Sequence, residues 1–406
     1  MDHVASYTAP SRLAGVQRLA IGVGVAGLAL CAVGFAAGRE QFFKSYLLAY
    51  VFWVGVSLGS LALMMVGHLS GGAWAVVIRR VNEASSRVLP FMAILFIPIA
   101  LGVHELYTWA NPEIVAHDAV LQHKAPYLNV PFFLARTALY FILWSSLAFL
   151  ISKLSLDQER GEHGQALKMQ RLSGGGLVVY ALTVLFMSVD WIMSLDPHWF
   201  STIYGILFMG GQGLSALAFT IAVVVLLSRI EPMSRVIAPA HLHDLGKLML
   251  AFVMLWAYFS FSQFLIIWSA NLPEEIPWYL KRMGGGWAYV GLGLIFLHFA
   301  LPFVLLLSRD LKRNGRTLIL VAVAVIVMRL VDLFWLIGPI GHDPAEGGHY
   351  AGQPAVMHLH WLDGVAPIAI GGIWLALFLW QLQTRSLLPL GEPYLAEALE
   401  HGRHGH

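Results

Sequence analysis

The sequence predicts an all-α integral membrane protein with ten transmembrane helices. Of its 406 residues, 58% are hydrophobic and only 12% are charged, whereas roughly a quarter of the residues are charged in soluble domains. The apolar residues gather in runs of about 20, the length that crosses the hydrocarbon core of a bilayer as a helix. Because no stretch is left that could fold as a soluble domain, we predict one polytopic membrane domain over residues 1–406.

Ten runs are predicted as membrane spans, joined by connections of different lengths. The predicted spans are residues 18–37, 46–68, 88–109, 130–152, 175–196, 203–228, 244–270, 287–307, 316–338 and 360–382. The first run is longer than the apolar core of a signal peptide and is followed by more membrane, so we interpret it as a retained span. Two of the longer connections, 110–129 and 339–359, are rich in Pro, His and acidic residues and are expected to be ordered surface loops.

The basic residues predict the orientation of the chain. With ten spans, 18 of the 25 Lys and Arg residues fall on the side of both termini, five fall on the opposite side, and Arg136 and Arg329 lie inside spans. Lys and Arg are retained on the cytoplasmic side of bacterial membranes. Both termini are therefore predicted to be cytoplasmic, and the alternation supports an even number of spans.

The seventh span carries polar residues along one face. At 100° per residue, four polar residues and one small residue fall within an arc roughly 60° wide on the helix surface. These are Lys247, Ala251, Tyr258, Ser262 and Ser269. Such a polar or small-residue stripe is expected to face protein or water rather than lipid. It predicts either close packing against another helix or the handling of protons or a ligand.

Charged residues in the outer halves of spans three to five are the next candidates. A charge at mid-bilayer costs at least about 2.5–3.5 kcal/mol, so each embedded charge needs a reason. Span three ends with His104 and Glu105, while Arg136 and Asp190 lie at comparable depth in spans four and five. Consecutive spans are usually neighbours, which predicts a cluster of these four residues. The alternative is a purely structural pair between Arg136 and one of the acids.

Spans eight and nine contribute a second group of embedded polar residues. Arg329 and Asp332 are three residues apart, on one face of a helix, and can pair. They lie about 20 and 24 Å from Arg316, in the outer half of the membrane. His298 lies near the midplane, where histidine either relays protons or serves as a hydrogen-bonded core residue.

At the cytoplasmic side, His68 is the last residue of span two, and Asp244 and Lys247 lie at the start of span seven. These three residues are candidates for proton entry, although Asp244 could equally be an ordinary N-cap of its helix.

The composition excludes several redox and binding functions. Cys31 is the single cysteine, so this chain alone cannot ligate an iron–sulfur cluster. A membrane b-type haem needs paired histidines at matched depth, and only His298 lies near the midplane. His358, His360 and Asp363 have the right ligand types for a metal, but three ligands without a fourth are a weak pattern. The near-neutral net charge of +2 argues against nucleic-acid binding.

Four long motifs carry a resemblance to a known family. They are LPFMAILFIPIALGVHELYTWA (89–110), SVDWIMSLDPHWFSTIYGILF (188–208), HDLGKLMLAFVMLWAYFSFSQFLIIWSANLPEEIPWY (243–279) and MRLVDLFWLIGP (328–339). With these motifs in this order, the chain resembles the ActF-type membrane subunits of alternative complex III, a quinol:electron-acceptor oxidoreductase, within the NrfD and polysulfide-reductase membrane-anchor family. The resemblance implies two four-helix bundles, spans 2–5 and 6–9, with spans 1 and 10 peripheral.

The resemblance also implies partners and a location. It places the chain in a bacterial inner membrane, in a complex with an iron–sulfur subunit, haem c subunits and a second NrfD-like membrane subunit. Those partners carry the iron–sulfur clusters and the haem c, and this chain holds no redox cofactor of its own. Whether it binds quinone or quinol stays open, since the quinol pocket of such complexes is usually placed in the second NrfD-like subunit.

Together these observations predict a subunit that supports quinol oxidation and moves protons through embedded polar groups. The predicted proton pathway comprises His68, His104, Glu105, Arg136, Asp190, Asp244, Lys247, Tyr258, Ser262, His298, Arg329 and Asp332. Two other functions are open. A structural anchor would use the same charges as fixed ion pairs. A secondary transporter would need helices interrupted at the midplane, and here the prolines lie mainly at the ends of spans, apart from Pro98 and Pro302.

Overall fold

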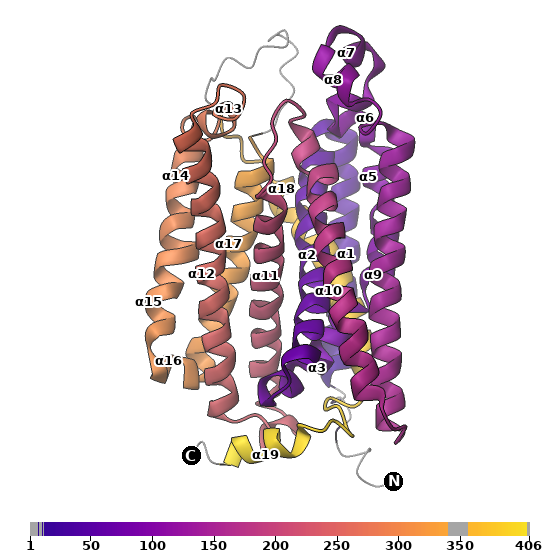
Figure 1. Cartoon of the computed structure of the whole chain (residues 1–406), viewed down its shortest axis with the longest axis vertical. Helices are drawn as coiled ribbons and strands as arrows, with labels where there is room; N and C mark the ends of the chain where they lie inside the picture. The colour runs from indigo at the N-terminus through magenta and orange to yellow at the C-terminus, as the bar shows by residue number, and fades with distance from the viewer. Residues whose placement is uncertain (1–6, 8–9, 11, 340–355, 404–406) are drawn as a thin grey trace.

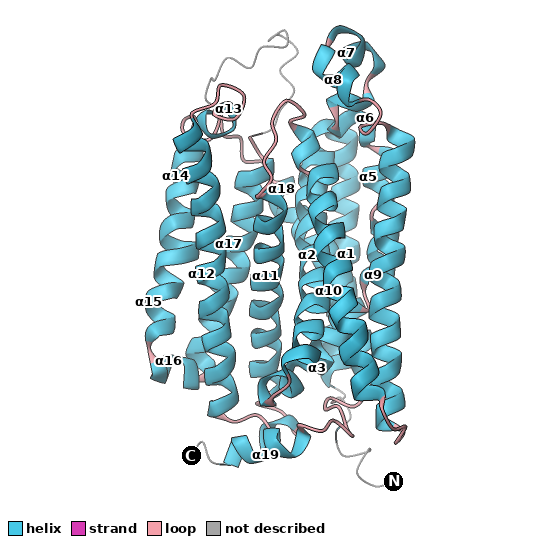
Figure 2. Cartoon of the chain, in the orientation of Figure 1, coloured by secondary structure: helices cyan, strands magenta, loops and turns pink. Residues whose placement is uncertain are grey.

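The computed structural model describes Tyr7, Pro10 and residues 12–339 and 356–403. In this part of the chain every regular element is helical, and ten helical segments are long and apolar enough to cross a membrane (Figures 1 and 2). The all-α fold class and the number of membrane-spanning helices, ten, are confirmed for the described residues. The chain is a multi-pass membrane protein.

The spanning segments and the short helices between them alternate along the chain. The spanning segments are α1 (Arg12–Ala37), α2 (Arg39–Ser70), α3 to α5 (Ala73–Ser86, Leu89–Leu95, Ile97–Leu101), α9 (Val130–Glu159), α10 with η3 (Gln165–Trp191, Met193–Leu195), α11 (Tyr204–Leu227), α12 (Pro239–Ala270), α14, η5 and α15 (Trp287–Gly293, Leu294–Ala300, Leu301–Leu307), α17 (Gly315–Ile337) and α18 (Leu362–Gln383). The remaining helices are α6 (Val103–Leu106), η2 (Thr108–Ala110), α7 (Pro112–His117), α8 (Ala119–Lys124), η4 (Met233–Arg235), α13 (Pro277–Leu280), α16 (Arg309–Arg313) and α19 (Leu395–Arg403).

The short helices mark the two ends of the helical stack. Figure 1 shows α3, α16 and α19 at one end, which we call the α3 end, and α6, α7, α8 and α13 at the other, the α7 end. The predicted surface loop 110–129 folds into η2, α7 and α8 at the α7 end. Of the other predicted loop, 339–359, residues 340–355 lie outside the described part of the chain.

The third span differs from its prediction of 88–109. The helical segment starts at Ala73 and ends at Leu101, with short interruptions at the Arg87–Val88 and Phe96 positions. It starts earlier because the charged residues of α3 are buried against neighbouring elements. From hydropathy alone, the same charged residues predict a polar loop. It ends earlier because the chain turns at Gly102 into the short α6.

The eighth span contains one turn of π-helix. The segment Leu294–Ala300 has this wider winding, and Pro302 follows it in the first turn of α15. Proline lacks the N–H that would bond to the carbonyl four residues earlier, which is that of His298, so the regular ladder is broken there. Single π-helical turns within α-helices are frequent at functional sites. The helix remains continuous through this turn, unlike the unwound segments of transporters.

The most deeply buried helices are α2 and α11, which pack along each other. Helix α2 also contacts α3, α10 and α18, and α11 also contacts α10, α12 and α17. The two backbones come very close at Gly59, where an added Cβ would lie 2.1 Å from the carbonyl oxygen of Gln212. Small residues allow such close approach between membrane helices. Helix α1 packs mainly on α18, at the periphery of the molecule.

A network of buried charges ties the C-terminal segment to the α3 end. Glu83 accepts hydrogen bonds from Arg79 and Arg80 on its own helix, and Arg385 approaches it at 3.3 Å. Arg79 also pairs with Glu392 and Arg80 with Glu159. Each charge is thus compensated although all are largely removed from water.

Basic residues at the α7 end have structural roles. Lys281 donates to Asp196 at 2.7 Å. Arg282 is buried and donates to the carbonyl oxygens of Trp278, Trp335 and Leu336, the last two in the final turn of α17. A cation that binds the free carbonyls at a helix C-terminus is stabilised by the helix dipole. Burial lowers the pKa of Arg282 to about 10, so it is still charged at neutral pH.

Candidate functional site

The candidate site lies between α11, α12, α17 and the π-helical turn. Arg329 and Asp332 form an ion pair one turn apart on α17, and both side chains are buried. The Nε1 of Trp256 on α12 donates to Asp332 Oδ2 at 3.0 Å. The structure therefore shows the predicted pair of Arg329 and Asp332 and adds a third, neutral partner from another helix.

His298 completes this site from the π-helical turn. Its side chain is 0% exposed, and its ring meets that of Trp256 edge to face, with the centroids 4.4 Å apart. Neither ring nitrogen has a hydrogen-bond partner among the described residues. A buried polar group without a partner is costly and is rare in folded proteins. His298 is therefore not the hydrogen-bonded core residue that its position alone would also allow.

Gly211 shapes the surroundings of the ion pair, and Gln263 lies farther along the inward face of α12. Gly211 on α11 leaves the space that the Arg329 guanidinium fills, because an added Cβ would lie 2.2 Å from its Cζ. Gln263 lies two turns from Trp256 on the same face of α12, since seven residues make nearly two full turns. It is buried, and neither its amide nitrogen nor its amide oxygen has a partner in the described part of the chain.

The other embedded acid, Asp190, is fully hydrogen-bonded. Arg136 donates to it twice, from Nε at 3.0 Å and from Nη2 at 2.9 Å. The hydroxyls of Tyr127 and Tyr140 donate to its two oxygens at 2.9 and 2.6 Å. Burial and the neighbouring carboxylate raise the pKa of Tyr127, which keeps this hydroxyl protonated as a donor. This arrangement matches the structural pair that was the alternative to a cluster.

His104 and Glu105 do not join Arg136 and Asp190. Both side chains are exposed at the α7 end, and His104 Nδ1 bonds the carbonyl oxygen of Ala110 at 2.9 Å. The prediction of a four-residue cluster is therefore wrong. The physical reason is the turn at Gly102, which ends the regular helix before these residues and changes their direction.

The predicted polar stripe of α12 faces outward. Tyr258 is 64% exposed, Lys247, Ala251 and Ser269 are exposed, and Ser262 is partly buried. The stripe was expected to face the protein interior or water; in this chain the interior is faced instead by Trp256 and Gln263. Lys247 pairs with Asp244 at 3.1 Å on the surface of the α3 end.

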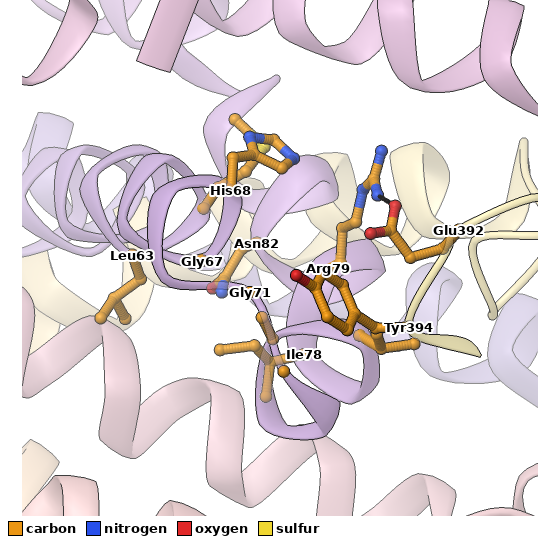
Figure 3. A pocket seen from close by; sticks show the side chains of 13 residues that line it. Leu63, Gly67, His68, Gly71, Ile78, Arg79, Asn82, Glu392 and Tyr394 are labelled. Atoms are coloured by element: carbon orange, nitrogen blue, oxygen red, sulfur yellow. Dashed lines mark hydrogen bonds and ion pairs between the residues drawn. The ribbon is translucent and has the colours of Figure 1, made fainter. Parts of the chain in front are cut away.

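His68 lines a small pocket at the α3 end, apart from Asp244 and Lys247. Its Nδ1 lies 3.1 Å from the hydroxyl of Ser173, and its Nε2 has no partner among the described residues. Figure 3 shows the imidazole above a pocket that also includes Arg79, paired with Glu392, and Tyr394 from the C-terminal segment. The cavity, about 20 Å³, has room for one water molecule.

No family model matches the chain, and no curated protein matches it. Among the described residues, no group of three or more His, Cys, Asp or Glu side chains could hold a metal ion. Asp363 was considered as a metal ligand together with His358 and His360. Its carboxylate accepts hydrogen bonds from Ser45 at 2.6 Å and from Gln41 at 3.2 Å.

The sequence argument missed Gly211 and Trp256 at this site, and it missed the buried Gln263 on the same helix face as Trp256. A signal for two of them was present, because Trp256 and Gln263 are spaced by seven residues and are among the few side chains of this span with polar atoms. The polar stripe on the opposite side contained more such residues and was preferred. Gly211 could not be found this way, since its role depends on an arginine from another helix.

Proposed function

We propose that this chain is a membrane subunit of a quinol-oxidising electron-transfer complex of the alternative complex III type. In this role it lies in a bacterial inner membrane beside an iron–sulfur subunit, haem c subunits and a second NrfD-like membrane subunit. The motifs at 89–110, 188–208, 243–279 and 328–339 support this assignment. The chain itself contributes proton transfer, while the electrons pass through cofactors of the partners.

The observation that carries the proton-transfer role is His298. It is fully buried near the middle of its span, its two ring nitrogens have no hydrogen-bond partner in the described part of the chain, and a carboxylate and a guanidinium lie in the same site. A neutral imidazole offers one acceptor and one donor nitrogen, so it can take a proton on one side and release one on the other. An embedded ionisable group that is not needed for the fold indicates function.

The neighbouring ion pair determines how long a proton stays on His298. Asp332 already compensates the charge of Arg329, so it cannot fully neutralise an imidazolium as well. A protonated His298 is therefore a short-lived state, as a relay requires. The hydrogen bond from Trp256 to Asp332 holds the carboxylate in place, and the edge contact of the indole orients the imidazole.

The topology belongs to the same proposal. Both termini are cytoplasmic, with the α3 end facing the cytoplasm, because most Lys and Arg residues are distributed to that side. Spans 2–5 and 6–9 form two four-helix bundles joined by the contact between α2 and α11. The packing of α10 on α9 and α2, and of α17 on α11, supports this grouping.

Substitution of Asp332 by Asn tests the proposal in the assembled complex. The exchange keeps the shape of the side chain and removes its charge, and it also leaves the buried Arg329 without its counter-charge, so the comparison is made on complex that still assembles. In that complex we expect quinol oxidation to continue with fewer protons released per electron. The measurement is proton release by the purified complex in sealed vesicles. An unchanged proton-to-electron ratio in an intact complex would argue against the relay role.

The second candidate function is that of a structural anchor, which the Asp190 site favours. All of the acceptors of Asp190 are occupied by fixed donors from α9 and from the loop before it. If the Asp332 site has the same role, substitutions there will reduce assembly of the complex rather than the proton-to-electron ratio. Quantifying the partner subunits that co-purify with each variant separates the two functions.

A further inference from the structure

A second pocket lies at the α3 end, between α3 and the end of α18. Its lining contains three arginines, Arg80, Arg87 and Arg385, but only one acid, Glu83. The cavity measures about 10 Å³, enough for a single water molecule or one oxygen of a larger ligand. The pocket is separate from the His298 site and from the pocket beside His68.

The charges around this pocket leave one arginine uncompensated. Glu83, Glu159 and Glu392 pair with Arg79, Arg80 and Arg385. The backbone N–H of Arg87 bonds the carbonyl oxygen of Glu83 at 3.1 Å, but its partly buried guanidinium makes no hydrogen bond or ion pair with a described residue. A guanidinium held among other arginines and partly removed from water is stabilised by an added anion.

Buried polar atoms in the lining also lack partners. Arg80 is 3% exposed and Gln381 is 5% exposed. The Nε of Arg80 and the side-chain oxygen of Gln381 have no hydrogen-bond partner among the described residues. One water in the cavity can accept from Arg80, donate to Gln381 and donate its second hydrogen to an anion at the mouth, the three bonds typical of buried waters.

The pocket mouth lies at the level of a membrane interface. Trp380, the neighbour of Gln381 in the last turn of α18, is 46% exposed, and its ring meets Phe91 edge to face at 5.9 Å. Exposed tryptophans at the ends of membrane helices sit at the headgroup level of the bilayer. Pro90, close to Arg87 in the chain, is exposed as well. The anion most available at that level is the phosphate of a phospholipid.

We propose that this pocket binds the headgroup phosphate of an anionic phospholipid, held by Arg87 and Arg385 at its mouth. Arginine is suited to this ligand because its planar fork presents parallel N–H groups to phosphate oxygens. Arg385 is positioned by Glu83 and by the carbonyl oxygen of Ser152, at 3.1 Å. Arg87 is free to turn toward the phosphate.

The test compares the bound lipid of four forms of the full chain, purified in mild detergent and analysed by native mass spectrometry. They are the wild type, Arg87→Gln, Arg87→Lys and the control Arg171→Gln, which alters an exposed arginine at the same end of the molecule. We expect phosphatidylglycerol to be retained by the wild type and by Arg171→Gln. Arg87→Gln should weaken its retention about tenfold, as loss of one charge-assisted hydrogen bond predicts. Arg87→Lys should retain part of the binding, because it keeps the charge and loses the fork.

A second arm separates lipid phosphate from free phosphate. The thermal midpoint of delipidated protein is measured with phosphatidylglycerol, phosphatidylcholine or inorganic phosphate added. We expect phosphatidylglycerol to stabilise the wild type more than Arg87→Gln, and inorganic phosphate to have no such selective effect. Stabilisation by inorganic phosphate alone would assign the site to the free ion and overturn the proposal. Equal retention of phosphatidylglycerol by the wild type and Arg87→Gln would overturn it as well.

Discussion

The two embedded acids of this protein, Asp190 and Asp332, have contrasting surroundings. Asp190 receives four hydrogen bonds, two from Arg136 and one each from Tyr127 and Tyr140. Asp332 pairs with Arg329 and accepts from Trp256, but it shares its site with a histidine that has no hydrogen-bond partner among the described residues. A carboxylate whose oxygens all accept hydrogen bonds stabilises the fold. A site that contains an ionisable group without a hydrogen-bond partner can still bind a proton.

The largest expected effect on stability comes from breaking the Asp190 site. Substitution of Asp190 by Asn leaves the Arg136 guanidinium buried without its counter-charge, so we expect a loss of about 3–5 kcal/mol in the free energy of unfolding. Denaturant unfolding in detergent micelles measures this loss. Tyr127→Phe is the matched control, since it removes one hydrogen bond and should cost about 1 kcal/mol. If Asp190→Asn cost no more than the control, the structural role assigned to Asp190 would be wrong.

Gly211→Ala should have an intermediate effect. The new methyl group would overlap the Arg329 guanidinium and displace it from Asp332, and such overpacking costs about 1–3 kcal/mol. Unfolding measurements should show this cost, and proton release by the complex should fall with it. Gly175→Ala on α10 is the control, because no heavy atom lies within 4 Å of an added Cβ there. Equal stability of the two variants would show that Arg329 is not confined as described.

Removing both charges of the second pair should have a small effect on stability. In Arg329→Met with Asp332→Leu no buried charge is left unpaired and one donor, the N–H of Trp256, loses its acceptor, so we expect the free energy of unfolding to change by less than about 2 kcal/mol. Proton release should nevertheless fall. The corresponding double variant, Arg136→Met with Asp190→Leu, leaves the hydroxyls of Tyr127 and Tyr140 without their acceptor and should be clearly less stable. If the double variant of Arg329 and Asp332 were less stable than the double variant of Arg136 and Asp190, the contrast between the two sites would be wrong.

The sequence predicted those features that depend on composition and on local spacing. Ten spans follow from apolar runs of sufficient length, and the pairing of Arg329 with Asp332 follows from their separation along one helix. The third span was misplaced because burial of Arg79, Arg80 and Glu83 by pairing is invisible to hydropathy.

Contacts between helices could not be predicted in the same way. Periodicity identified a polar face on α12, but which face meets another helix is determined by the packing of α11, α17 and the π-helical turn. Trp256 and Gln263 therefore became visible only in the structure. Likewise, His104 and Glu105 were expected to point toward Arg136 and Asp190, and the turn at Gly102 redirects the chain.

The measurement that tests the central claim most directly is the proton-to-electron ratio of the complex with His298→Leu. Leucine is similar in size and cannot carry a proton, and because the imidazole makes no hydrogen bond within the described chain, stability should change by less than about 1.5 kcal/mol. His104→Leu, which alters an exposed histidine, is the control. We predict a lower ratio for His298→Leu in a fully assembled complex and a wild-type ratio for the control. A wild-type ratio for His298→Leu would contradict the assignment of this site to proton transfer.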